Sequence, residues 1–123
     1  MSTSDTCVTI SPYFVIKDGQ IDKARQFMTA LVEKTKSEEA CLYYGFTIHG
    51  NRLHCREGYR DGAGALAHVD NVGALLGEWL ESGCVELVEL QIHGPEAELA
   101  KLREPLAGLN PDYWVLEQGF RNP

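Results

Sequence analysis

The stretch CREGYRDGAGALAHVDNVGALLGEW, residues 55–79, decides the fold that the sequence predicts. It begins as a strand and ends as a helix, with a connection rich in glycine and alanine between them. Side chains alternate along a strand, so every second residue lies on the same face. One face of this strand carries Leu53, Cys55, Glu57 and Tyr59. The sequence therefore places a carboxyl group and a phenol on an otherwise apolar face.

The second half of the stretch predicts two helices. Asp61 is suited to cap a short helix that runs to Ala67, and Asp70 or Asn71 to cap the next one. The second helix has an apolar stripe at the i, i+3, i+4, i+7, i+8 spacing: Val72, Leu75, Leu76, Trp79 and Leu80. His68 lies between the two helices. Because a carboxyl, a phenol, an imidazole and an indole gather at this strand-to-helix corner, we expect any chemistry to occur there.

The composition of the whole chain limits the classes of function. Its 123 residues suit one domain with a single core, and 44% hydrophobic residues are typical of a globular protein. The net charge of −7 argues against nucleic acid and anionic membranes as partners. No apolar run approaches the roughly 20 residues of a membrane helix, and the start MSTSDTC has no signal-peptide pattern. We therefore expect a cytoplasmic protein.

Cysteine and histidine spacings give no metal-binding signature. The four cysteines form no CxxC pair, so we expect buried, reduced thiols rather than a zinc or redox site. The four histidines show neither an i, i+4 pair nor an HExxH pattern. The sequence therefore predicts that the protein binds no metal.

The order of elements predicts an α+β fold. Strands are expected at 7–16, 41–49, 52–59 and 84–93, with helices at 20–38 and across the corner. Gly50-Asn51 predicts a two-residue hairpin that sets Tyr44 opposite Glu57 and Leu42 opposite Tyr59. This order is the split βαβ arrangement of ferredoxin-like domains, with an antiparallel sheet. A helix from Gly94-Pro95 and a strand at 113–120 form a C-terminal extension, 94–123, to a core of about 8–93 within one domain, 1–123.

The sheet face that the helices leave open also carries large side chains in this prediction: Tyr13, Tyr43, Leu87 and Val115. An apolar face needs a cover, and a second copy of the chain is the simplest one. We therefore expect a homodimer.

The corner also resembles a known family. The pattern Glu57-x-Tyr59-x-Asp61, followed by Ala63, Ala65 and His68, is similar to the antibiotic biosynthesis monooxygenase family, and the similarity covers about residues 8–93. Members of that family pair two ferredoxin-like subunits into a dimeric α+β barrel. The resemblance thus implies the same fold and a homodimer, with a C-terminal tail that subunits of such barrels often exchange.

The resemblance implies cofactor-independent oxygenation of a small phenolic or quinol substrate. The substrate is deprotonated to an anion that reacts directly with dioxygen, without flavin, haem or metal. Related barrels that degrade haem use an Asn in the first strand, where this chain has Thr9, Ser11 and Tyr13. The alternative function is a non-catalytic dimer of the same fold that binds a small ligand.

Three residues are candidates for catalysis. His68 has a pKa suited to a general base near neutral pH; the alternative is a ring that caps a helix or packs at the subunit interface. Glu57 either accepts a proton, if burial raises its pKa, or orients His68; the alternative is a structural carboxyl bonded to Tyr44 or to the backbone. Tyr59 either donates a hydrogen bond to a substrate oxygen or fills the core.

Trp79, Tyr44 and Phe27 are the candidates for substrate binding. Trp79 is suited to form one wall of a flat aromatic site, and plain core packing is the alternative for it and for Phe27. Basic or titratable side chains also line the opposite face of the hairpin: His49, Arg52, His54 and Arg56. These four either bind an anionic substrate or face a partner or solvent.

Overall fold

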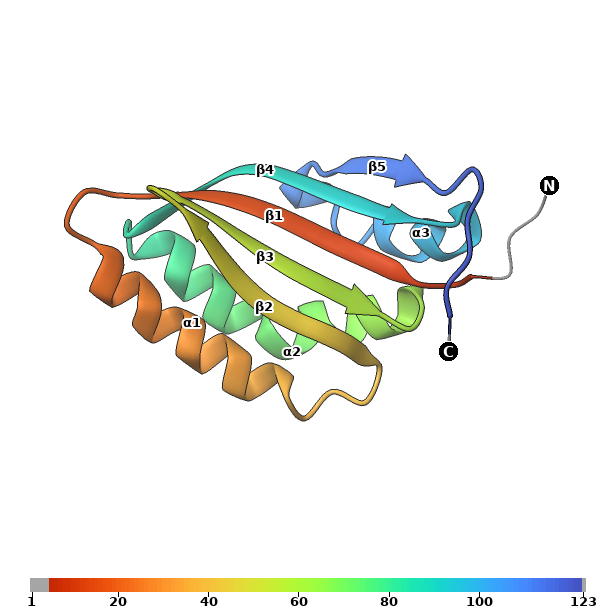
Figure 1. Cartoon of the computed structure of the whole chain (residues 1–123), viewed down its shortest axis with the longest axis horizontal. Helices are drawn as coiled ribbons and strands as arrows, with labels where there is room; N and C mark the ends of the chain where they lie inside the picture. Colours follow the sequence, from red (N-terminus) through yellow and green to blue (C-terminus); the bar gives the residue numbers. More distant parts are fainter. Residues whose placement is uncertain (1–4, 123) are drawn as a thin grey trace.

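The computed structural model describes residues 5–122 and contains a five-stranded sheet with its helices on one face (Figure 1). The elements are β1 (Val8–Ile16), α1 (Ile21–Thr35), β2 (Cys41–His49), β3 (Arg52–Tyr59), α2 (Gly62–Glu81), β4 (Val85–Gly94), α3 (Glu96–Arg103), the 3-10 helix η1 (Ala107–Leu109) and β5 (Asp112–Val115). The strand order is β2-β3-β1-β4-β5. This is the predicted ferredoxin-like α+β arrangement.

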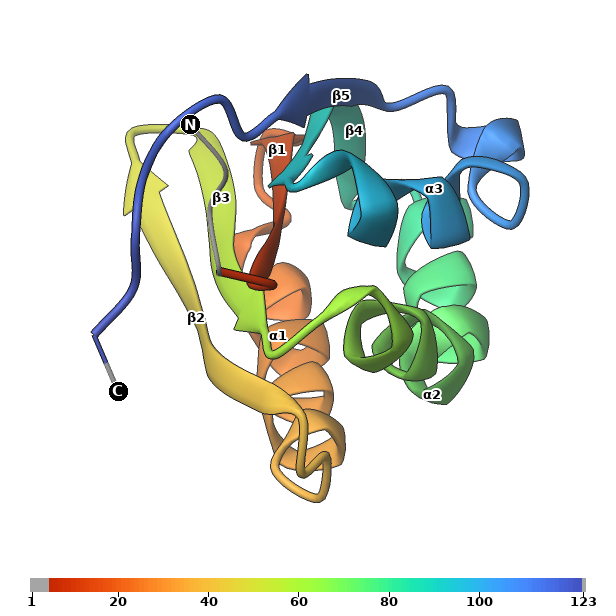
Figure 2. The same ribbon diagram turned by 90° about the vertical axis from the view of Figure 1, so that its right-hand side faces the viewer.

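The sheet is mixed, which the prediction of an antiparallel sheet did not include. The four core strands are antiparallel, as predicted, but β5 pairs with β4 in parallel. The crossover through α3 and η1 returns the chain to the sheet in the direction of β4, as a parallel pair requires. Figure 2 shows α1 and α2 together on one side of the sheet. Buried and half-buried residues alternate strictly along β1, so every second side chain of this strand points to these two helices.

The hairpin register is largely as predicted. Tyr44 pairs with Glu57 and Phe46 with Cys55, so β3 presents Leu53, Cys55, Glu57 and Tyr59 on its buried face. The prediction that Leu42 faces Tyr59 is wrong. A bulge between Cys41 and Tyr43 moves the pairing by one residue, so that Cys41 faces Tyr59 and Leu42 is exposed.

The corner holds one continuous helix rather than the two that the sequence predicted. Asp61 caps α2 as expected, since its Oδ1 accepts a hydrogen bond from the Gly64 amide at 2.8 Å. The predicted second cap at Asn71 is absent. The Asn71 side chain donates its hydrogen bonds outside α2, to the Lys34 carbonyl and to Glu38. Within residues 5–122, no helix is both long and apolar enough to span a bilayer.

Two further boundaries and the face of one residue differ from the prediction. Helix α1 ends at Thr35, not near residue 38, and β5 ends at Val115, not at 120, because β4 offers it only residues 91–94 as partners. Leu87 lies on the helix side of the sheet, not on the open face. A register irregularity in the pairing of β1 with β4, between Tyr13 and Phe14, brings both Leu87 and Leu90 to the helix side.

Candidate functional site

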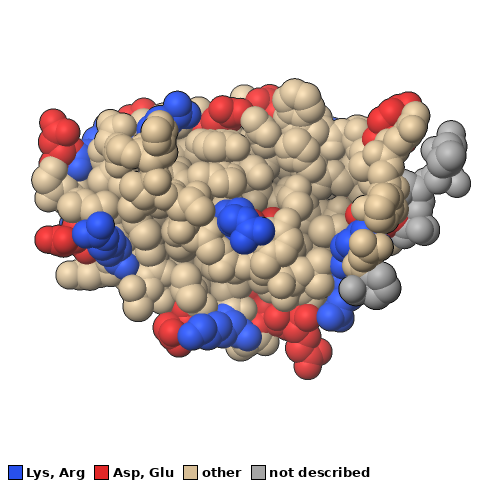
Figure 3. Space-filling view, in the orientation of Figure 1, with Lys and Arg blue, Asp and Glu red and all other residues tan. Residues whose placement is uncertain are grey.

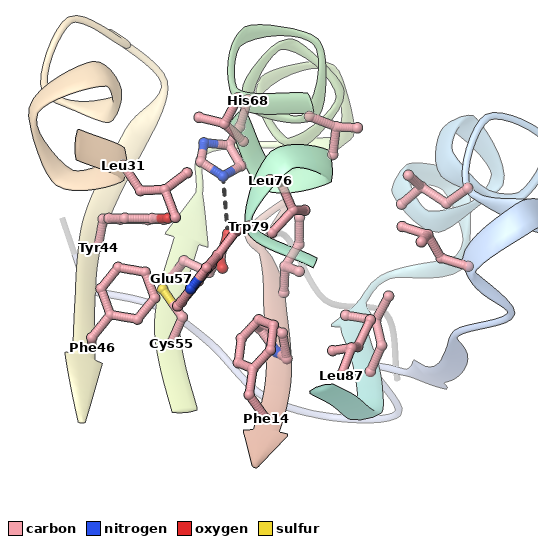
Figure 4. Close-up of a pocket in the computed structure, with 17 residues that line it drawn as sticks. Phe14, Leu31, Tyr44, Phe46, Cys55, Glu57, His68, Leu76, Trp79 and Leu87 are labelled. Carbon is pink, nitrogen blue, oxygen red and sulfur yellow. Dashed lines mark ion pairs between the residues drawn. The ribbon is translucent and has the colours of Figure 1, made fainter. Parts of the chain in front are cut away.

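His68 is at the centre of a buried cluster of titratable groups. It projects from α2 and is only 4% exposed. Its Nδ1 lies 2.9 Å from Oε2 of Glu38, and its Nε2 lies 3.4 Å from Oε1 of Glu57. Figure 4 shows the imidazole pointing from α2 to the Glu57 carboxyl on the sheet. The two nitrogen atoms of one ring therefore each face a different carboxyl group.

Glu57 is buried in the floor of the site and is held there by its neighbours. The Tyr59 hydroxyl donates a hydrogen bond of 2.5 Å to its Oε1. Burial raises the pKa of the Glu57 carboxyl to about 8, although hydrogen bonds from Tyr59 and Cys55 oppose the rise. A carboxyl in an apolar environment keeps its proton because the charged form would lose its hydration. Glu57 is therefore mostly a neutral acid near pH 7.

Burial lowers the pKa of His68, and the charge of Glu38 and its hydrogen bond oppose this. The ring is thus mostly neutral near pH 7, with one N–H and one lone pair. A carboxylate accepts hydrogen bonds, so Glu38 holds the N–H on Nδ1 and leaves the lone pair on Nε2. The site therefore combines a base at Nε2 of His68 with an acid at Glu57.

Glu38 is a functional candidate that the sequence analysis missed. It follows the end of α1, where the Glu38 amide bonds the Thr35 carbonyl, and its side chain turns under α2. Asn71 donates to its Oε2 at 2.8 Å, which fixes the carboxylate beside His68. The approach of this loop to α2 is close: a Cβ added at Gly64 would lie 2.6 Å from that of Ala40. The glycine at position 64 was the sequence feature that could have indicated this close approach, but it does not identify Glu38 as the residue that reaches His68.

The cluster opens into an apolar cavity of about 70 Å³ between α2 and the sheet. It is lined by Ile10, Pro12, Phe14, Leu31, Tyr44, Phe46, Cys55, Glu57, His68, Val69, Val72, Leu76, Trp79, Leu87, Leu90, Leu106 and Leu109. Four of the six candidates predicted from the sequence are in its wall: His68, Glu57, Tyr44 and Trp79. The structure thus brings these four side chains to one space.

The other two candidates lie behind the wall. Tyr59 is fully buried and reaches the site only through its hydrogen bond to Glu57. Phe27 stacks on Trp79 with ring centroids 6.0 Å apart and supports that indole from the side of α1. The basic residues of the hairpin face away from the cavity: His54 stacks on Tyr13 at 4.4 Å, and Arg56 lies over the Tyr43 ring at 4.7 Å.

Comparison with solved structures identifies proteins of the same fold. The structure of MupZ from Pseudomonas fluorescens is 36% identical to this chain, with 100% of this chain and 94% of MupZ covered and a TM-score of 0.92. A protein of Deinococcus radiodurans assigned as an antibiotic biosynthesis monooxygenase is 17% identical over 69% of this chain and 86% of its own, with a TM-score of 0.58. A conserved protein of unknown function from Bacteroides thetaiotaomicron is 15% identical over 72% of this chain and 97% of its own, with a TM-score of 0.63.

No family model matches the sequence, and no curated protein matches it. The shared class is therefore defined by structure: an α+β domain of ferredoxin-like topology. With 36% identity over its whole length, the chain belongs to the same family as MupZ, and it shares its fold with the antibiotic biosynthesis monooxygenase-like proteins.

Glu38→Gln tests whether Glu38 positions and tunes His68. Removing the charge beside Nδ1 should lower the pKa of His68 further, because Glu38 raises it in the native site. The acid limb of the profile of kcat/KM against pH should then move to lower pH, and turnover should fall by about tenfold or more. Glu33→Gln is the matched control, since Glu33 is exposed on α1 and pairs with Lys36. An unchanged acid limb would contradict the role of Glu38.

Proposed function

We propose that this protein is an acid–base enzyme that moves protons on a small, largely apolar substrate bearing an oxygen atom. One observation carries the proposal: the neutral acid Glu57 and the lone pair of His68 Nε2 face each other across 3.4 Å inside an apolar cavity. A substrate hydroxyl beside this pair can give its proton to Nε2 while its oxygen accepts a hydrogen bond from Glu57. Burial strengthens both interactions because little water screens them.

Within this class, we propose cofactor-independent oxygenation of a phenolic or quinol substrate. His68 takes the phenolic proton, and Glu57 hydrogen-bonds the oxygen of the anion that forms. That electron-rich anion transfers one electron to dioxygen, and the resulting substrate radical and superoxide combine into a carbon-bound peroxide. Loss of water then breaks the O–O bond, so one oxygen atom stays on the substrate as a carbonyl, the other leaves in the water, and the substrate itself supplies all the electrons. The fold that this chain shares with a protein assigned as an antibiotic biosynthesis monooxygenase and the base at the cavity wall support this reaction. Glu38 would stabilise the imidazolium that carries the abstracted proton.

The raised pKa of Glu57 favours a second candidate, an acid-catalysed addition or rearrangement that consumes no dioxygen. A general acid must be protonated at the working pH, and a carboxyl with a pKa of about 8 meets this condition. In this reaction Glu57 would protonate a substrate oxygen, and His68 would accept the proton released elsewhere on the substrate.

Dioxygen uptake and product analysis separate these functions. We expect the protein, incubated with a panel of quinols and anthrones, to consume dioxygen in proportion to substrate, and His68→Ala to abolish the excess over buffer. Conversion that continues without dioxygen would support the acid-catalysed function instead. Tight binding without conversion in either condition would support the non-catalytic ligand-binding alternative.

We also propose that the protein is a homodimer, joined through the open face of the sheet. Figure 3 shows this face, which is mostly uncharged. Exposed side chains on it include Tyr43, Val88 and Trp114, and Trp114 stacks on His93 at 5.7 Å. A second copy would remove these apolar groups from water.

Light scattering should therefore give twice the mass of the chain at micromolar concentration, with an interface that buries on the order of 2,000 Å² or more. Trp114→Glu should shift the protein towards the monomer, because it places a charge in the interface. Leu109→Glu is the matched control for dimerisation, since Leu109 is also a large exposed apolar residue but lines the cavity rather than the open face of the sheet. A wild-type protein that is monomeric under these conditions would contradict the proposal.

A further inference from the structure

The part of the cavity at Trp79 is enclosed by aromatic rings. The centroid of the indole lies 5.1 Å from that of Phe14, 5.7 Å from that of Phe46 and 6.0 Å from that of Phe27. A buried water molecule needs about two to four polar partners, and these phenylalanine rings provide none. The cavity volume of about 70 Å³ is several times the roughly 10–15 Å³ that a water molecule requires. The space at Trp79 therefore suits a small apolar molecule better than water.

Trp79 carries a hydrogen-bond donor without a partner. The residue is fully buried, and its Nε1 is one of four buried side-chain atoms in residues 5–122 that have no hydrogen-bond partner. Among these four, it alone belongs to a residue of the cavity wall. Buried N–H groups are nearly always paired, because an unpaired donor loses its hydration without compensation. The indole N–H is therefore available to a negatively charged oxygen that forms in the cavity.

The acid–base pair and Trp79 lie at different levels of the sheet. The indole contacts two phenylalanines whose partners on β3 are Leu53 and Cys55. These are two to four residues from Glu57, so at about 3.4 Å per residue the two levels are roughly 7–13 Å apart. The negative charge of a phenolate is shared with ring carbons away from its oxygen, and one of these carbons is oxygenated. A substrate whose oxygen lies at Glu57 extends its ring into the cavity, so its reacting carbon comes closer to Trp79 than its oxygen does.

We propose that Trp79 forms the dioxygen subsite of this cavity: dioxygen binds against the aromatic rings, and the indole N–H donates a hydrogen bond to the superoxide formed from it. One electron passes from the substrate anion to dioxygen, and superoxide then forms the carbon–oxygen bond with the substrate radical. The indole keeps its proton throughout and stabilises the charge on oxygen, which apolar walls alone would disfavour. This inference rests on the proposed oxygenation. It makes Trp79 a catalytic residue for the dioxygen half of the reaction.

The dependence of the rate on dioxygen concentration tests this role. Trp79→Phe keeps an aromatic ring and removes the N–H, so it should lower kcat/KM for dioxygen by about 10- to 100-fold, the range for a hydrogen bond to a charged oxygen. The Kd of the quinol, measured without dioxygen, should change far less. Superoxide that escapes, detected by reduction of cytochrome c, should rise as a share of the dioxygen consumed. Trp114→Phe is the matched control, because Trp114 is exposed and stacks on His93.

The outcomes separate this subsite from the proposed function. If the wild type consumes dioxygen and Trp79→Phe has an unchanged kcat/KM for dioxygen, the subsite is overturned and the oxygenation stands. An equal fall in kcat/KM for dioxygen and in affinity for the quinol would give Trp79 a structural role and would also overturn the subsite alone. A wild type that consumes no dioxygen with any quinol or anthrone would overturn the oxygenation, and the subsite with it.

Nuclear magnetic resonance of the wild-type protein tests the subsite even if Trp79→Phe does not fold. The chain has 2 tryptophans, so two indole N–H signals are expected, and Trp114→Phe assigns them. Paramagnetic dioxygen under pressure should broaden the Trp79 signal more than the Trp114 signal, and a gadolinium chelate, which is too large for the cavity, should do the reverse. Weaker broadening of Trp79 by dioxygen would overturn the subsite. A downfield shift of the Trp79 signal on adding a quinol without dioxygen would also overturn it, because the substrate would then supply the acceptor.

Discussion

Replacing His68 with alanine should lower the turnover of any accepted substrate by about 10² to 10⁴, the range for loss of a general base. The reason is local: Nε2 of His68 is the neutral base that faces Glu57, and Glu38 holds the ring in the matching tautomer. Without the imidazole, the substrate proton has no acceptor at this position. The measurement is initial rate per folded molecule, with the folded fraction taken from urea unfolding of each variant.

The same replacement should also cost stability. His68 is 4% exposed and bonds Glu38, so its removal leaves a buried carboxylate with one partner fewer. We expect a loss of about 1–3 kcal/mol in the free energy of unfolding. His68→Asn keeps a polar group and is the second variant; His49→Ala, exposed at the end of β2, is the matched control. Unchanged activity per folded molecule in both His68 variants would remove His68 from the mechanism.

The strand half of the site was predictable because its period is short and local. Alternation alone placed Glu57 and Tyr59 on the buried face, and the Gly50-Asn51 turn fixed the pairing of Tyr44 with Glu57. That reasoning failed at Leu42, where a bulge depends on the packing of neighbouring elements and leaves no clear mark in the sequence. The acid and its hydrogen-bonded environment therefore followed from the sequence, up to the edge of the sheet.

The helix half was less predictable because it depends on contacts between distant residues. Asn71 resembles a helix cap in the sequence, but in the structure it bonds Glu38, more than 30 residues away, and α2 continues through it. Glu38 was missed for the same reason, since nothing near it in the sequence marks where α1 ends or where the next turn points. The sequence motif therefore predicted His68 as the base but did not identify Glu38, the carboxylate that orients it.

Replacing Glu57 with glutamine should make the stability of the protein less dependent on pH. The pKa of Glu57 is about 8 in the folded protein and 4.5 for a glutamate side chain in water, so between these values the folded chain holds a proton that the unfolded chain has lost. Wild-type stability therefore falls with rising pH across this window, by about 1.4 kcal/mol per pH unit, and the contribution of Glu57 is fully present only below about pH 4.5.

Glutamine has the shape of the neutral acid and can still accept the hydrogen bond of Tyr59, but it has no proton to lose. The stability of the variant relative to the wild type should therefore increase as pH rises, until their free energies of unfolding differ by on the order of 4 kcal/mol near pH 8. His68 is present in both chains, so the opposite effect of its lowered pKa, a loss of stability as pH falls, largely cancels in the difference. Urea unfolding of both chains at intervals from about pH 5 to about pH 8 measures it, with exposed Glu33→Gln as control. A difference that stays constant over this range would mean that Glu57 is charged in the folded protein, and the neutral acid on which both proposed reactions depend would be lost.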